Sequence, residues 1–243
     1  MTTLVKQSRR IPIWLIVSVI LGALVLATPF LVLRSFLFQP FSTPSGSMEP
    51  NLLAGDHFFV SKYPYGYSRY SLPYAPPWFS GRIFGAEPRY GEVVVYRLPV
   101  NPSIDYVKRV VGLPGDRVQM IAGQLYLNGT PVKRERLADI VTQDGRAKKW
   151  RETLPNGASY EILDLIDNGS LDDTQVYVVP PGHYFVLGDN RDNSQDSRIL
   201  ARHGYVPFEN LVGRAEIIFW STDPNARDAN SGAQFNRVGR RVR

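Results

Sequence analysis

A short proline-flanked turn carries two serines that could supply a nucleophile. Its sequence is Pro44-Ser-Gly-Ser-Met-Glu-Pro50, with Ser45 and Ser47 on either side of Gly46. Glycine lets a substrate approach the backbone closely, and the prolines restrict the chain on both sides. A serine hydroxyl becomes a useful nucleophile only beside a base, so this turn predicts a candidate nucleophile and leaves the base to be found.

Lys108 is a candidate for that base. Strand alternation puts Ile104, Tyr106, Lys108 and Val110 on one face, and Asp105, Val107, Arg109 and Val111 on the other. Lys108 is therefore the one charge in an apolar row, and two interpretations stay open. Its amine can reach water at the rim of the sheet. Alternatively it is buried, and then desolvation lowers the pKa of the amine, with Arg109 acting in the same direction, which yields a competent general base.

A dense polar loop, residues 188–198, follows an apolar strand. It is either a solvated turn or a network of buried ion pairs that holds the loop in one geometry. The stretch 189–196 superficially resembles a calcium loop. It lacks the central glycine and the closing glutamate of such a loop, and Arg191 and Arg198 would repel a cation. We therefore expect no metal site.

Other kinds of catalytic site find little support. The chain has no H-E-x-x-H, P-loop, G-x-G-x-x-G or G-x-S-x-G motif. The absence of cysteine excludes a thiol nucleophile, a Cys-ligated zinc and a disulfide framework. His57, His183 and His203 are each isolated, and a structural role is the default for all of them.

An apolar segment, residues 11–33, contains no ionisable residue and follows Lys6, Arg9 and Arg10. At ~1.5 Å per helical residue it spans roughly 34 Å, enough to cross a ~30 Å hydrocarbon core. A cleaved secretory signal has a shorter apolar region, and a buried core helix is rarely apolar on every face. The segment predicts a transmembrane helix, with residues 1–10 as a cytoplasmic basic N-terminus and residues 34–243 across the membrane.

The rest of the chain predicts a mainly β fold of antiparallel sheets. Strands are expected at residues 92–98, 105–111, 116–121, 124–127, 130–132, 176–179, 183–187 and 215–220, without the alternating helices of a parallel sheet. Asn128-Gly129 suits a tight hairpin turn. Residues 34–132 and 176–222 form the predicted β-rich domain, and the more polar residues 133–175 an inserted second lobe. Residues 223–243 are expected to be a basic, solvated tail.

Aromatic residues gather between residues 58 and 84, mixed with prolines and glycines. They predict either a loop pinned by packed rings or a surface that enters the bilayer interface. The net charge of +6 would suit a nucleic acid or a membrane surface. No motif of interleaved aromatic and basic residues supports nucleic-acid binding, so we expect no nucleic-acid partner.

Taken together, these segments resemble bacterial type I signal peptidase, a membrane-bound serine–lysine protease. The resemblance covers residues 11 to about 220. Its motifs are Pro44-Ser-Gly-Ser-Met-x-Pro50, Gly55-Asp56 with Val60-x-Lys62, Tyr106-Val-Lys-Arg-Val-Val-Gly-Leu-Pro-Gly-Asp116, and Gly188-Asp-Asn-Arg-Asp-Asn-Ser-x-Asp-Ser-Arg198.

The resemblance implies that Ser47 is the nucleophile and Lys108 its general base. It implies that Ser45 completes an oxyanion hole with the Ser47 N–H and that Ser194 orients the lysine amine. The supporting ion pairs would be formed by Arg109, Asp189, Asp196 and Arg198. The expected substrate-binding residues are Phe41, Thr43, Met48, Leu52, Tyr106 and Val107.

The resemblance also implies cleavage of signal peptides after small residues of the Ala-x-Ala type, without a cofactor. The partners would be pre-proteins and the lipid bilayer, and the catalytic domain would lie on the outer, periplasmic face of the inner (plasma) membrane. Thr43 departs from the usual apolar residue, which puts the shape of one pocket in doubt. Asn51 departs from a common threonine, a change expected to be without consequence.

Two alternatives are open. The chain could be a catalytically silent, membrane-anchored binding protein that keeps the same fold. It could also be a self-cleaving repressor-like protein, although such proteins are soluble and carry a DNA-binding domain, and neither feature is evident in this sequence.

Overall fold

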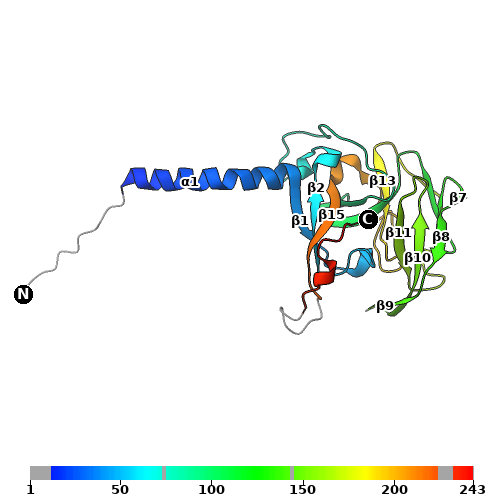
Figure 1. Ribbon diagram of the computed structural model, residues 1–243. Helices are drawn as coiled ribbons and strands as arrows, with labels where there is room; N and C mark the ends of the chain where they lie inside the picture. Colours follow the sequence, from blue (N-terminus) through cyan, green and yellow to red (C-terminus); the bar gives the residue numbers. More distant parts are fainter. Residues whose placement is uncertain (1–11, 73–74, 143–144, 224–231, 243) are drawn as a thin grey trace, which may run out of the picture.

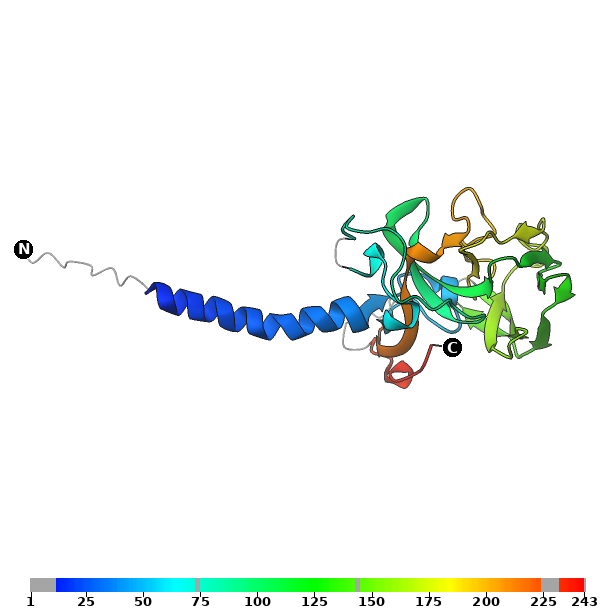
Figure 2. The same cartoon turned by 90° about the horizontal axis from the view of Figure 1, so that it is seen from above.

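The computed structural model describes residues 12–72, 75–142, 145–223 and 232–242. Helix α1 (Ile13–Val32) leads through a π-helical turn (Leu33–Leu37) into a β-rich body and extends away from it (Figures 1 and 2). Within the described residues, no helix is both long enough and apolar enough to cross a membrane. Residue 11 and the side chains of residues 30–33 lie outside the description, and the span predicted at residues 11–33 stays a prediction.

A seven-stranded antiparallel sheet forms the centre of the body, in the order β1-β2-β15-β3-β4-β13-β14. Its strands are β1 (Phe38–Ser42), β2 (Asp56–Ser61), β3 (Val93–Leu98), β4 (Asn101–Gly112), β13 (His183–Leu187), β14 (Val206–Pro207) and β15 (Leu211–Ser221). The predicted mainly antiparallel β fold is confirmed.

Two four-stranded sheets complete the body. One contains β12 (Tyr177–Val178), β5 (Arg117–Ile121), β6 (Gln124–Leu127) and β7 (Thr130–Pro131). The other contains β11 (Ser159–Asp164), β10 (Gly145–Thr153), β8 (Lys133–Arg136) and β9 (Ile140–Thr142). Short 3-10 turns lie at Gly46–Met48, Tyr63–Tyr65, Arg69–Ser71, Phe208–Asn210 and Phe235–Arg237.

The hairpin between β6 and β7 has the turn that its sequence predicts. Asn128 and Gly129 have φ values of 52° and 80°, and a type I′ turn requires positive φ at both central positions. Strands β8 to β11 were less evident from sequence because β10 alternates weakly. Its residues are mostly exposed or half-buried, and only Ala147 and Glu152 are buried.

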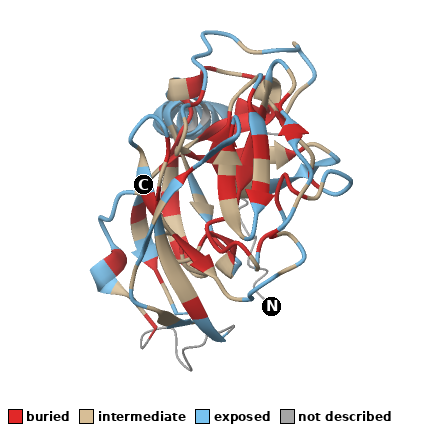
Figure 3. Cartoon of the chain, turned by 90° about the vertical axis from the view of Figure 1, so that its right-hand side faces the viewer, coloured by how far each residue is buried: buried red, intermediate tan, exposed pale blue. Residues whose placement is uncertain are grey.

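Buried residues gather in the strands inside the β-rich body (Figure 3), and the central strand β3 is buried on both faces. Val93 and Val95 belong to one hydrophobic cluster, and Val94 and Tyr96 to another. Alternation along a strand produces this division, and burial on both faces explains the almost uninterrupted apolar run in the sequence. The neighbouring β4 pairs with β3 on one side and with β13 on the other, which fixes its position in the sheet.

The C-terminal segment is docked, which corrects the expectation of a solvated tail. Val242 N donates to Glu216 O, and Gly239 N donates to Ile218 O, so the segment lies along β15. The pairing of β3 with β15 ends at Arg214, which leaves this part of the β15 edge open for the tail. Arg237 forms a buried ion pair with Asp56 that holds the tail in place.

The aromatic residues between 58 and 84 divide between core and surface. Phe58 and Tyr65 are buried, whereas Trp78 is 80% exposed and Phe84 is 87% exposed. Residues 73–74 lie outside the description. Packed rings therefore account for part of this segment, and contact of the exposed rings with lipid stays a prediction.

Candidate active site

Ser47 lies on the 3-10 turn Gly46–Met48 between β1 and β2, and it is only 8% exposed. The next side chain, Met48, enters the core, as does Leu52, whose backbone N–H donates to Met48 O. Packing of these two side chains holds the turn in one conformation and so fixes the position of the Ser47 hydroxyl. The burial of Met48 and Leu52 thus holds Ser47 in position.

Lys108 on β4 is 2% exposed, and its Nζ donates to Ser47 Oγ at 2.7 Å and to Val107 O at 3.1 Å. Burial lowers the pKa of Lys108 to about 8, although Asp196 and Asp189 act to raise it. Of the two interpretations left open by the sequence, the geometry corresponds to the buried amine. The distance to Ser47 Oγ lies within the range for direct proton transfer.

The two further serines differ in their contacts. Ser45 is exposed, and its Oγ donates to Ser47 Oγ at 3.3 Å. Ser194 lines a cavity together with Ser47 and Lys108. The hydrogen bonds found for the Lys108 amine go to Ser47 Oγ and Val107 O, and orientation of the amine by Ser194 stays a prediction. Ser194 packs on Gly188, where an added Cβ would lie 2.2 Å from the hydroxyl.

The polar loop at residues 188–198 is a buried ion-pair network. Arg109 donates to both carboxylate oxygens of Asp189 at 2.6–2.7 Å, and Arg198 donates to both of Asp196 at 2.8 Å. Burial would raise the pKa of Asp196, but Arg198 and the Gly188 N–H lower it, so this carboxylate stays charged. No group of three or more His, Cys, Asp or Glu suited to a metal occurs among the described residues.

Two links in this region were not anticipated from the sequence. Asn51 Nδ2 donates to Asp189 Oδ2 at 2.8 Å and to Glu161 O on β11 at 2.7 Å. The substitution of threonine by asparagine therefore has a structural consequence, because the amide joins the turn after Ser47 to the second lobe. Asn190 N also donates to Ser47 O at 3.2 Å, which connects the polar loop directly to the turn that carries Ser47.

A cavity of about 270 Å³ opens beside Ser47 and Lys108. Of the predicted substrate-binding residues, Phe41, Tyr106 and Val107 line it. Thr43, Met48 and Leu52 are buried and do not belong to this lining, and their contact with substrate stays a prediction. Val95 and Ile104 line the cavity and were missed, since contact across the sheet was not evident from their positions in the sequence.

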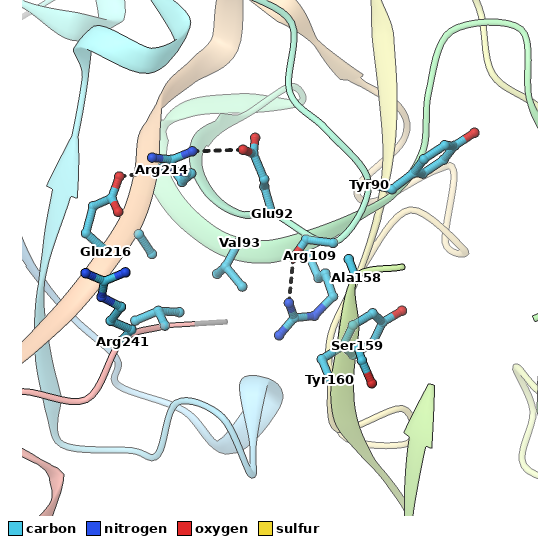
Figure 4. A pocket seen from close by; sticks show the side chains of 13 residues that line it. Tyr90, Glu92, Val93, Arg109, Ala158, Ser159, Tyr160, Arg214, Glu216 and Arg241 are labelled. Atoms are coloured by element: carbon cyan, nitrogen blue, oxygen red, sulfur yellow. Dashed lines mark hydrogen bonds and ion pairs between the residues drawn. The ribbon is translucent and has the colours of Figure 1, made fainter. Parts of the chain in front are cut away.

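A larger cavity of about 550 Å³ lies elsewhere, between β15, the start of β3 and the second lobe (Figure 4). Arg109 lines it from β4, while Lys108 points to the other face. Part of its charged wall is paired internally, because Arg214 bridges Glu92 and Glu216 at 2.9 Å each. Neither Ser47 nor Lys108 lines this cavity, whereas both line the cavity of about 520 Å³ that Ser194 lines.

Comparisons with known proteins find similar sequences over most of the chain. The family model described as signal peptidase, peptidase S26, matches residues 13–220. Signal peptidase I of Rickettsia typhi (strain ATCC VR-144 / Wilmington) is 44% identical over 201 residues, covering 79% of this chain and 75% of the relative. Signal peptidase I of Rickettsia akari (strain Hartford) is 42% identical over 211 residues, covering 83% and 79%. A crystal structure of a signal peptidase I from Enterococcus faecalis V583 is 26% identical, covers 53% of this chain and 97% of its own, and has a TM-score of 0.34.

Proposed function

The chain belongs to the signal peptidase family, peptidase S26, and from that premise we propose that it cleaves signal peptides with Ser47 as nucleophile and Lys108 as general base. The observation that carries the proposal is the 2.7 Å contact between the buried Lys108 amine and Ser47 Oγ. With a pKa of about 8 for Lys108, roughly a tenth of the amine is neutral at pH 7.

In this mechanism neutral Lys108 takes the proton of Ser47 as Oγ attacks the scissile carbonyl. The resulting oxyanion accepts hydrogen bonds from the Ser47 N–H and from Ser45 Oγ, which rotates away from Ser47 Oγ to reach it. The Lys108 ammonium then protonates the leaving amine, and an acyl-enzyme remains on Ser47. Lys108, neutral again, takes a proton from water as the water oxygen attacks the ester. The Lys108 ammonium then returns this proton to Ser47 Oγ as the signal peptide leaves, which restores both residues.

We further propose that the 270 Å³ cavity selects small side chains near the scissile bond. Phe41, Val107 and Tyr106 give it apolar walls, and two of them lie on β4. Such walls favour alanine over charged or large residues, which supports specificity of the Ala-x-Ala type.

Anchoring in the plasma membrane is part of the same proposal. The described large apolar side chains of α1 are exposed, and Lys6, Arg9 and Arg10 precede it. These features support a single-pass protein with a cytoplasmic N-terminus and its catalytic body on the outer face. Ser47 lies thirteen positions after Arg34, so the nucleophile would lie at most ~45 Å from the anchor.

The experiment uses the full chain in detergent and a pre-protein that bears a signal peptide. Ser47→Ala and Lys108→Ala should each abolish cleavage, whereas Ser159→Ala and Lys133→Ala, at exposed positions outside the site, should cleave normally. Full activity of either site variant would refute the dyad. A wild-type protein that binds the signal peptide without cutting it would favour the silent binding protein.

A further inference from the structure

A small aromatic cluster lies behind the wall of the substrate cavity. Tyr96 on β3 and Tyr106 on β4 are cross-strand partners, with ring centroids 6.3 Å apart. The ring of His203 packs edge-on against both, with its centroid 5.5 Å from that of Tyr96 and 5.0 Å from that of Tyr106. His203 Nε2 is hydrogen-bonded to Tyr96 Oη, and the histidine is 1% exposed.

Tyr106 connects this cluster to the proposed chemistry. It lines the cavity that contains Ser47 and Lys108, and Lys108 Nζ lies 5.7 Å from its ring centroid. One side of the Tyr106 ring therefore faces the cavity, while His203 packs against the ring from behind. The position of this wall depends on what fills the space behind it.

His203 reaches this position from a turn that follows the polar loop. His203 N donates to Ile199 O at 2.9 Å, and Ile199 lines the cavity that contains Lys108 and Ser194. The turn thus contributes two residues to this region. Ile199 lines the cavity, and His203 packs against the Tyr106 ring.

The histidine is neutral at the pH of the reaction. Burial lowers the pKa of His203 to about 4, against an opposing effect of Asp196, and the charge of Lys108 lowers it further. The titratable groups that interact with the ring are Tyr96, Tyr106, Asp196 and Lys108. A neutral ring fills the space without adding a charge that would repel the ammonium form of Lys108.

We propose that His203 is a positioning residue, which holds the Tyr106 ring against the cavity and thereby sets the cavity's depth and keeps water away from the Lys108 amine. The proposal rests on the Ser47–Lys108 function proposed above. Tyr96 fixes the imidazole through the Nε2 hydrogen bond, and the imidazole fixes Tyr106 by packing. A residue that merely filled the core would affect stability and leave the pH dependence and the selectivity of cleavage unchanged.

The test compares His203→Ala and His203→Gln with the wild type as full chains in detergent. The glutamine can still bond Tyr96 Oη but has no ring to place against Tyr106. The substrates are synthetic signal-peptide fragments with alanine or leucine immediately before the scissile bond. We measure kcat/KM from pH 6 to 10 for each pair.

In both variants the apparent pKa of the rate should rise by about one, because water reaches Lys108, and kcat/KM at pH 7 should fall about tenfold. The preference for alanine over leucine should fall several-fold, because the Tyr106 ring can retreat. Leu125→Ala, which removes an equally buried side chain from a different hydrophobic cluster, controls for lost stability and should change neither quantity.

If one variant does not fold, the other decides the question, and Tyr96→Phe adds a milder variant that removes the hydrogen bond from the opposite side. An unchanged pKa of the rate and an unchanged preference in the folded variants would overturn the role of His203. Failure of the proposed function is distinguishable, because then the wild type would not cleave, or Lys108→Ala would cleave as well as the wild type.

Discussion

Lys108→Met should abolish cleavage and at the same time stabilise the fold. Lys108 is 2% exposed, and its pKa falls from 10.5 to about 8 in the folded chain. Below both values the unfolded chain holds the proton more tightly, so the charged amine opposes folding. At about 1.4 kcal/mol for each pH unit between the two pKa values, the cost at pH 7 is about 3 kcal/mol. Methionine has a similar length without the charge, so it removes this cost.

The pH dependence has a definite sign. Between pH 8 and 10.5 the unfolded chain binds more protons than the folded one, so the stability of the wild type rises with pH. With folded and unfolded pKa values of about 8 and 10.5, the cost of the lysine falls to about 1 kcal/mol at pH 10. The advantage of methionine over lysine should shrink by the same amount.

The assay is thermal unfolding of the full chain in detergent at pH 7 and pH 10. At pH 7 Lys108→Met should unfold about 6–12 °C above the wild type for a chain of this size. Ser47→Ala is the matched control, because it is equally inactive but keeps the buried amine. If Lys108→Met were no more stable than Ser47→Ala at pH 7, or if its advantage were equal at both pH values, the buried-amine explanation would be refuted.

Three further outcomes follow from the same contacts. The wild-type kcat/KM should rise with pH and level off above an apparent pKa of about 8, because protonated Lys108 cannot accept the Ser47 proton; a flat rate profile from pH 6 to 9 would contradict this. Gly188→Ala should reduce kcat at least tenfold, because the added Cβ would lie 2.2 Å from Ser194 Oγ and 2.6 Å from Ser47 O. Steady-state kinetics would measure kcat, and circular dichroism would show that the variant is folded. Arg237→Ala should lower the free energy of unfolding by about 3–5 kcal/mol, because the variant leaves the buried Asp56 carboxylate without its ion-pair partner. Denaturant unfolding would measure this loss, with Arg240→Ala, at an exposed position, as the control.

Local pattern in the sequence offered Ser45, Ser47 and Lys108 as candidates, and the family resemblance assigned their roles. Both serines lie between glycine and proline constraints, and the alternation along β4 makes Lys108 the one charge in an apolar row. Whether that lysine is buried could not be decided locally, because the atoms that cover it come from distant segments. Ser47 lies 61 residues before Lys108 in the chain, and Asp196 lies in the polar loop that follows β13.

Two features that the sequence did not reveal have a common physical cause. Met48 and Leu52 lie close to Ser47 in sequence, yet both side chains are part of a hydrophobic core cluster. The basic tail has the composition of a solvated end, yet an open edge of β15 and the buried carboxylate of Asp56 provide partners for it. In each case the deciding partner lies far along the chain, where pattern and composition carry no information.

The buried charges in the polar loop explain why the pKa of Lys108 is low even though two carboxylates are near it. Asp189 and Asp196 each raise the pKa of the amine, and alone they would favour the ammonium form. Each is neutralised by its own guanidinium, Arg109 or Arg198, through paired hydrogen bonds. Buried ion pairs of this kind contribute little net stability. Here they hold the loop rigid around Lys108 while their fields largely cancel, so that burial decides the protonation of the amine.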